Sequence, residues 1–197
     1  MQKQRTNIKN QSLIYHITDL ANLGAILKEG IKSRSELNPR LFSDVADRQI
    51  LEGREAHNLH KMVPFHFFAR NPFDGSVQER NPDIEFVILT VHRRLAAQEN
   101  WKIIPRHPLA IGKFQILEYA EGMDAIDWEL MSKREYHDPE CKSVCMAECL
   151  SPTTVPSSNI FSIYTRNGKV AEEVGMLCNR YNLTPHINVQ TAFFING

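Results

Sequence analysis

The strand-like runs of this chain are joined by connections of very unequal length, and this spacing limits the folds open to it. Apolar runs of strand length lie at residues 13–17, 62–68, 84–91, 101–104, 143–152, 160–164 and 187–195. A doubly wound parallel sheet needs a crossover helix after each strand, and that regular alternation is missing. The sequence therefore predicts a mixed α+β domain with largely antiparallel pairing. A length of 197 residues suits one domain, residues 1–197.

Helical periodicity accounts for several of the connections. In the clearest case, Thr18 or Asp19 can cap a helix with apolar residues at helical spacing, and Gly30 stands where a left-handed C-terminal residue belongs. Further helices are predicted at residues 44–57, 93–98, 113–119, 128–134 and 170–181. Residues 70–82 contain Asn-Pro and Asp-Gly pairs and are predicted to form a long loop, and residues 1–11 a flexible polar arm.

Composition and motifs narrow the classes of function. Lys plus Arg equals Asp plus Glu, at 23 each, so no global field attracts nucleic acid and any such binding needs a local patch. No apolar run approaches the length of a membrane span, and residues 1–11 lack the apolar core of a secretory leader. The common ATP-binding, Rossmann, zinc-protease and serine-hydrolase motifs are absent from the sequence. We therefore expect a cytoplasmic protein without membrane contact.

A structural metal is not expected. The four cysteines show no CxxC spacing and read as small buried thiols in a reducing compartment: Cys141, Cys145, Cys149 and Cys178. His57, His60 and His66 are the one histidine cluster worth a metal hypothesis, and no acidic ligand pattern accompanies them. A chance grouping is the more economical interpretation.

One carboxylate, Glu148, interrupts the small and apolar run at residues 143–152. Because strand residues alternate sides, Val144, Met146, Glu148 and Leu150 are predicted to share one face. An ionised group on a largely apolar face is costly to bury unpaired, so Glu148 either meets a partner or opens into a cleft. The alternative is a solvated residue on an edge strand, which is common for Glu.

Five segments, in order along the chain, resemble the DarT-type ADP-ribosyltransferases of the DarTG toxin–antitoxin systems. They are YHITD at residues 15–19 with the following NL and IL pairs, VPFHF at 63–67 with RNP at 70–72, IDW at 126–128 with Met131, AECL at 147–150, and NLT at 182–184. The family forms of the first four are YHIT, VPFYF, VDW and AE[FA]L. Together the segments cover residues 13 to about 194.

The resemblance implies both a fold and an activity. The implied fold is the ADP-ribosyltransferase core, a split sandwich of small, mainly antiparallel sheets with flanking helices around an NAD cleft. The implied reaction transfers ADP-ribose from NAD to a base of single-stranded DNA, with NAD as substrate and no metal. In this family the enzyme is the toxin, and a macrodomain antitoxin (DarG-like) removes the modification. RNA or protein as the acceptor, and a non-catalytic interaction domain that retains the cleft, are the alternatives.

The resemblance also assigns roles to single residues. Glu148 corresponds to the catalytic glutamate, which can bind the ribose 2′-hydroxyl, stabilise the oxocarbenium-like state and help remove a proton from the attacking base. Arg54 takes the position of the functional arginine, and Arg48 is the alternative if the helix register differs. An ordinary solvated helix face is the simpler interpretation of that arginine.

For the cofactor, the resemblance places His16 and Thr18 on the nicotinamide side of NAD, with Asn22 and the first turn of its helix offering further donors. A buried histidine with satisfied hydrogen bonds is the simpler interpretation of His16.

The sequence indicates the residues that contact nucleic acid less clearly. His66, Phe68 and Arg70 lie in or beside the VPFHF segment and are candidates for DNA contact. Further basic and aromatic candidates for a single-strand groove are Lys32, Arg34, Arg40, Phe42 and Phe73. The chain lacks the family's glycine-rich insertion before VPFHF, where only residues 55–62 connect the arginine helix to the strand. We therefore predict no particular base or sequence context.

Overall fold

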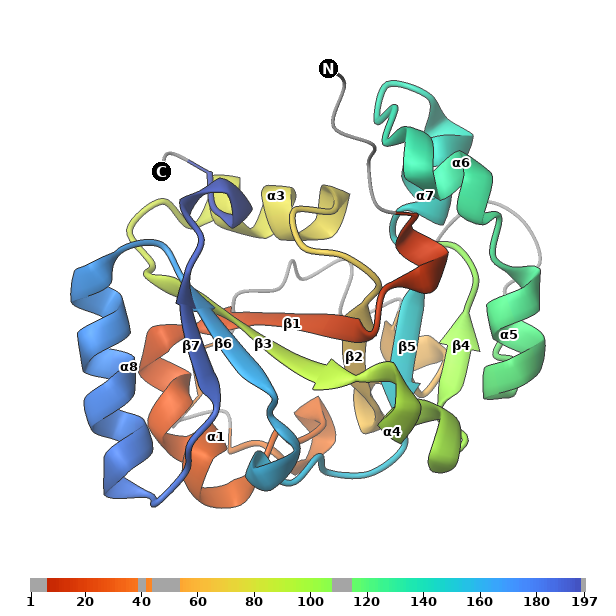
Figure 1. The fold of residues 1–197 in the computed structure, drawn as a ribbon. Coiled ribbons are helices and arrows are strands. Elements are labelled where there is room, and N and C mark those ends of the chain that lie inside the picture. The colour runs from red at the N-terminus through yellow and green to blue at the C-terminus, as the bar shows by residue number, and fades with distance from the viewer. Residues whose placement is uncertain (1–6, 39–41, 44–53, 108–114, 196–197) are drawn as a thin grey trace.

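The computed structural model describes residues 7–38, 42–43, 54–107 and 115–195, and their strands form one seven-stranded sheet. Its order is β4-β5-β2-β1-β3-β6-β7 (Figure 1). The strands are β1 (Leu13–Asp19), β2 (Val63–His66), β3 (Phe86–His92), β4 (Lys102–Ile104), β5 (Glu148–Ser151), β6 (Ser162–Thr165) and β7 (His186–Val189). All neighbours pair antiparallel except β6 and β7, which are parallel. The predicted mixed α+β class with largely antiparallel pairing is confirmed.

The sheet has a seam in its middle. β1 pairs with β3 along its whole length, from Leu13 to Asp19, but with β2 only at Tyr15 opposite His66. The side chain of His16 bridges the seam, because its Nδ1 lies 2.8 Å from the carbonyl oxygen of Pro64 on β2. Since Pro64 has no N–H to give on that side, β2 behaves locally as an edge strand although it lies inside the sheet. The expected split into small sheets thus takes the form of one sheet opened at the β1–β2 seam.

Helices cover the two halves of the sheet separately. They are α1 (Leu23–Glu29), α3 (Pro72–Arg80), α4 (Arg93–Gln98), α5 (Tyr119–Ala125), α6 (Trp128–Lys133), α7 (Pro139–Val144) and α8 (Gly168–Arg180). Helices α1 and α8 pack together, with α8 against β6 and β7, and α5 lies beside β4 (Figure 1). The predicted helix after the first strand is confirmed, and Gly30 ends it with a φ of 87°, a backbone conformation that glycine adopts without strain. None of the described helices is long and apolar enough to cross a membrane.

The N-terminal segment is held more firmly than the sequence suggested. Residues 1–6 lie outside the described residues, but Ile8–Asn10 form a 3₁₀ turn and Ile8 is buried in the core. The guanidinium of Arg93 holds this turn by donating hydrogen bonds to the carbonyl oxygens of Ile8 and Lys9, both at 3.0 Å. The prediction of a flexible arm is therefore wrong for the part of residues 1–11 that the structure describes.

Arg93 also ties that turn to the sheet, so its loss is expected to destabilise the fold. Its remaining nitrogens donate to the carbonyl oxygens of Leu13 and Phe67, and its side chain is buried. Arg93→Met leaves these carbonyls without partners and is expected to lower the free energy of unfolding by about 3–5 kcal/mol in urea denaturation. The neighbouring Arg94→Met, at an exposed position, is the matched control and is expected to stay within about 0.5 kcal/mol of wild type. Equal losses in both variants would contradict this assignment.

Two segments adopt a different structure from the one predicted, one expected as a loop and one expected as a strand. Residues 70–82 contain α3 rather than a long loop: Asn71 Oδ1 accepts from the backbone N–H groups of Phe73 and Asp74, and Pro72 occupies the first turn. Helix α7 begins at Pro139 with Asp138 as its cap and ends at Val144, so it takes up the start of the predicted strand. Of the strand predicted at residues 143–152, only Glu148–Ser151 is β-strand.

The boundaries of two further elements differ from the predicted ones. The helix predicted at residues 113–119 instead begins at Tyr119, within the described part of that segment, and contains Gly122. That glycine lies against Ile103, where an added Cβ atom would overlap the Ile103 Cβ, so it serves close packing rather than a turn. The final strand ends at Val189 and is followed by a 3₁₀ turn at Thr191–Phe193.

Candidate functional site

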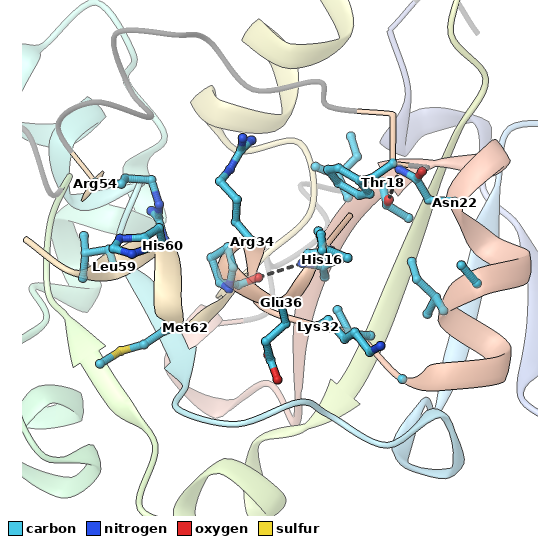
Figure 2. Close-up of a pocket in the computed structure, with 18 of the residues that line it drawn as sticks. His16, Thr18, Asn22, Lys32, Arg34, Glu36, Arg54, Leu59, His60 and Met62 are labelled. Carbon is cyan, nitrogen blue, oxygen red and sulfur yellow. Dashed lines mark hydrogen bonds between the residues drawn. The ribbon is translucent and has the colours of Figure 1, made fainter. Parts of the chain in front are cut away.

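A cavity of about 350 Å³ opens at the β1–β2 seam (Figure 2). Its walls come from β1, β2 and the start of β5, from α1, and from two segments that follow α1 and precede β2. Its charged and polar lining includes His16, Thr18, Asn22, Glu29, Lys32, Arg34, Glu36, Asn38, Arg54, His60, His66 and Glu148. The volume lies in the range of small-molecule sites, and the weak pairing of β1 with β2 is what makes room for it.

Glu148 and Arg54 form a buried ion pair in this cavity. Nη1 of Arg54 donates to both carboxylate oxygens of Glu148, each at 2.7 Å, and the side chains are 11% and 7% exposed respectively. Glu148 is the first residue of β5 and faces His66 on β2 and Ile104 on β4, so it lies on an interior strand. A solvated edge-strand glutamate is therefore the wrong interpretation of this residue. Nη2 of Arg54 is buried without a hydrogen-bond partner among the described residues.

An unpartnered buried guanidinium nitrogen carries an energetic cost that a bound anion would remove. Leaving a buried donor unsatisfied costs about 1–3 kcal/mol, and a guanidinium is suited to phosphate and carboxylate oxygens. Lys32 and Arg34 line the same cavity and add positive charge. The cavity therefore suits a ligand that carries phosphate groups and places its reacting carbon atom beside the Glu148 carboxylate.

His16 and Thr18 reach the cavity from alternate positions of β1 and so share a face of the strand. Asn22 lines it too, but its side-chain amide is engaged within the chain. Its Nδ2 donates to Thr18 Oγ1 at 3.3 Å and to the carbonyl oxygen of Ser43 at 3.0 Å, while Oδ1 accepts from Ser43 N–H at 3.0 Å. Asn22 thus anchors the chain at Ser43, next to Phe42 of the cavity wall, a contact that sequence reasoning did not foresee.

Two buried histidines in the cavity wall are neutral at physiological pH. Burial lowers the pKa of His16, and the hydrogen bond to Pro64 only partly offsets this. Burial likewise lowers the pKa of His66, against the opposing effects of Glu148 and of the Ala147 carbonyl. Because a carbonyl oxygen can only accept, Nδ1 carries the proton in both rings, and Nε2 is left as an acceptor.

The neutral state of His16 predicts a pH dependence of stability. Below its usual pKa of 6.5 the unfolded chain binds a proton at His16 that the folded chain does not bind, so the free energy of unfolding falls as the pH falls. Since Asn does not titrate but keeps a donor for Pro64, the stability advantage of wild type over His16→Asn is expected to shrink below pH 6.5. The limiting slope is about 1.4 kcal/mol per pH unit, measured by urea denaturation between about pH 8 and pH 5.

The matched control is His137→Asn, because His137 is exposed in the folded chain. Asp74 is buried and its pKa is raised to about 7, so it opposes the histidines over the same pH range. Its effect is common to wild type and variant and cancels in the difference. A difference between wild type and His16→Asn that stays constant from pH 8 to pH 5 would show that His16 is not held neutral.

The predicted nucleic-acid residues are only partly brought together. His66 lines the cavity, and its ring centroid lies 5.1 Å from that of Phe73, which lines it as well. Phe68, in contrast, is buried in the core beneath the guanidinium of Arg134, which prevents a base from stacking on it. Arg70 is exposed, donates to the carbonyl oxygen of Ala192 and is not part of the cavity wall.

The remaining candidates divide between the cavity and the undescribed segments. Lys32, Arg34 and Phe42 line the cavity, whereas Arg40 and Arg48 lie outside the described residues. Sequence reasoning missed Glu36 as part of the site and considered His60 only as a metal ligand. Glu36 belongs to a capping box with Ser33, a recognisable spacing, and the Nδ1 of His60 has no partner among the described residues. No three His, Cys, Asp or Glu side chains in the described residues come together to hold a metal ion.

Comparisons with known proteins agree with this geometry. The family model "ssDNA thymidine ADP-ribosyltransferase, DarT" matches residues 15–195. A DNA ADP-ribosyl transferase–DNA ADP-ribosyl glycohydrolase fusion protein of Thermosipho africanus (strain H17ap60334) is 27% identical over 201 residues, which is 92% of this chain. The chain spans 49% of that fusion protein, about half its length.

The fold matches solved structures as well. Thermus sp. 2.9 DarT in complex with ADP-ribosylated ssDNA superposes with a TM-score of 0.81 at 22% identity, covering 93% of this chain and 96% of the other. The same Thermus protein in complex with NAD+ gives a TM-score of 0.75 at 21% identity, covering 94% and 98%. These matches confirm the ADP-ribosyltransferase fold of the chain.

Proposed function

Because the chain belongs to the DarT family of single-stranded-DNA thymidine ADP-ribosyltransferases, we propose that it transfers ADP-ribose from NAD to thymidine in single-stranded DNA. The observation that carries the proposal furthest is the buried Glu148–Arg54 pair in the cavity at the β1–β2 seam. A buried carboxylate beside a polar cavity of this size is suited to stabilising positive charge that develops on a ribose.

The reaction can be written with these groups. In thymidine N1 is bonded to deoxyribose, so N3 is the ring nitrogen left to attack, and N3 carries a proton. Attack of N3 on C1 of the nicotinamide-bearing ribose forms the new C–N bond. The bond to nicotinamide breaks, and nicotinamide leaves as a neutral molecule with the bonding electrons. The carboxylate of Glu148 holds the ribose 2′-hydroxyl, stabilises the oxocarbenium-like state and accepts the N3 proton.

The other residues of the cavity hold the substrate. His16 and Thr18, side by side on β1, bind the nicotinamide end of NAD. Arg54 holds the Glu148 carboxylate in place through Nη1, and its Nη2, which has no partner among the described residues, binds an oxygen of NAD. Asn22 acts through Ser43 by fixing the chain at the cavity wall. Of the two arginines considered for the functional role, Arg54 is the one supported by the contact with Glu148.

The biological setting follows from the same family. We propose that residues 1–197 contain one ADP-ribosyltransferase domain that acts as a toxin in the cytoplasm, where NAD and DNA meet. The four cysteines are free and buried, which is consistent with a reducing compartment. Because a relative joins the two activities in one chain, we propose a DNA ADP-ribosyl glycohydrolase with a macrodomain as the antitoxin partner.

Mass spectrometry of oligonucleotides incubated with NAD tests this function. Single-stranded oligonucleotides containing thymidine are expected to gain one ADP-ribose on thymidine, whereas oligonucleotides of the same length without thymidine are expected to stay unmodified. Matched RNA and a mixture of proteins serve as the other acceptors. Modification of RNA or protein in place of DNA, or no consumption of NAD with any acceptor, would overturn the proposal.

A further inference from the structure

A second cavity, of about 380 Å³, lies between α3 and α7, beside the NAD-binding cavity. Phe73 lines both cavities, so the two adjoin at this ring. The second cavity is also lined by Arg80 on α3, by Lys142 and Ser143 on α7, and by Met146. Figure 1 shows α3 and α7 as separate helices, and residues 81–138 lie between them in sequence.

The second cavity lies within electrostatic reach of the reacting centre. Its wall includes His107, whose backbone N–H donates to the carbonyl oxygen of Ser143 at 2.8 Å. Burial lowers the pKa of His107, and the Glu148 carboxylate partly offsets that effect. Because Phe73 lines both cavities, a ligand that extends past this ring from the first cavity reaches the second.

The chemistry of its wall is that of a nucleotide site. Arg80 and Lys142 bring positive charge, and none of the described residues that line this cavity is an aspartate or a glutamate. The whole chain has a net charge of zero, so the excess of positively charged side chains in this cavity wall is a local feature. Phe73 and Met146 offer an aromatic face and a polarizable side chain on which a base can pack.

Ser143 adds an independent observation. Its hydroxyl oxygen is buried at the cavity wall and has no hydrogen-bond partner among the described residues. A buried hydroxyl without a partner is costly, and a ligand atom in the cavity would satisfy it.

We propose that the cavity between α3 and α7 binds the nucleotide adjacent to the modified thymidine in single-stranded DNA. Arg80 and Lys142 contact its phosphates, the base packs on Phe73 and Met146, and Ser143 supplies a hydrogen bond. This inference rests on the proposed function, and it moves DNA recognition from Phe68 and Arg70 to the α3–α7 cavity. The site acts on the strand alone and leaves NAD binding unchanged.

The test compares two double variants of equal charge change. Arg80→Gln with Lys142→Gln removes both cations of the cavity, and Lys169→Gln with Arg180→Gln removes two exposed cations of α8. Binding of fluorescein-labelled oligothymidylate is measured by anisotropy without NAD, over a series of salt concentrations. The cavity variant is expected to raise Kd about tenfold and to lower the salt slope by about 0.7 for each phosphate that it no longer neutralises, whereas the α8 variant stays near wild type.

Ser143→Ala separates a binding role from a structural one. Because the hydroxyl has no partner within the described chain, its removal is expected to leave the urea midpoint unchanged or higher, and never lower, while weakening oligothymidylate binding severalfold. NAD affinity, measured by calorimetry, is expected to be unchanged in all three variants.

The experiments distinguish a failure of this inference from a failure of the proposed function. If wild type transfers ADP-ribose to oligothymidylate but the cavity and α8 variants bind it equally well, the second site is wrong and the function stands. Weaker NAD binding in the cavity variant would also overturn the assignment. If wild type transfers nothing to single-stranded DNA, the function itself fails.

Discussion

Glu148→Gln is expected to lower kcat for ADP-ribose transfer to single-stranded DNA by about 10²–10³-fold. Glutamine keeps the shape of the side chain and an oxygen that accepts from Arg54, but it carries no charge to stabilise the ribose cation and takes up no proton. Affinity for NAD is expected to change little, because the stabilisation that disappears belongs to the transition state. Single-turnover kinetics with saturating NAD measures the effect, and calorimetry measures NAD binding.

The control for this variant is Glu172→Gln, which removes one carboxylate from the exposed face of α8. It is expected to transfer at the wild-type rate. A thermal unfolding curve for Glu148→Gln is needed beside the kinetics, because Arg54 loses its ionised partner. Near-normal transfer by a folded Glu148→Gln protein would exclude the assigned role of the carboxylate.

Arg54→Lys is expected to lower kcat/KM by about 10²-fold, although the charge is retained. A lysine offers one ammonium group in place of the planar guanidinium, so it cannot hold the Glu148 carboxylate through Nη1 and also reach the substrate through Nη2. If Nη2 binds an oxygen of NAD in the ground state, the loss appears mainly as a higher KM for NAD. If it acts on the developing charge, kcat falls instead.

Arg180→Lys, at an exposed position on α8, is the matched control and is expected to leave both constants unchanged. Wild-type kcat and KM in Arg54→Lys would mean that the bidentate contact with Glu148 has no catalytic role. An effect on stability alone, with normal kinetics of the folded fraction, would assign the pair to the core instead.

Several parts of the fold could be read from the sequence because their signals are local. Cap, apolar spacing and terminal glycine lie within one segment at α1, and Phe86–His92 is apolar through most of its length. The local signals were ambiguous at Asn71-Pro72, where the Asn-Pro pair starts a helix rather than a turn, and Asp138-Pro139 starts α7 in the same way. Tertiary packing decides between the two outcomes, because α3 buries Val77 and α7 buries Cys141 and Val144 against the core.

The functional site, too, could be predicted from the sequence only in part. The segments that resemble the DarT family named Glu148, Arg54, His16 and Thr18, and the structure gathers all four around one cavity. Phe68 carried the same sequence signal as Phe73, yet one ring is buried beneath Arg134 and the other separates two cavities. Exposure depends on which element packs over a residue, and a single aromatic in a sequence does not reveal that.

By itself, the sequence determined the α+β class, the positions of most strands and the family to which the chain belongs, because periodicity, capping and motifs act over a few neighbouring residues. Only the tertiary structure decided that β1 and β2 meet at a single pair of residues and leave a seam. It also decided that Arg54 reaches across 94 residues of sequence to Glu148. Such contacts depend on the packing of whole elements around a shared core, and no local pattern encodes the distance between side chains that those elements bring together.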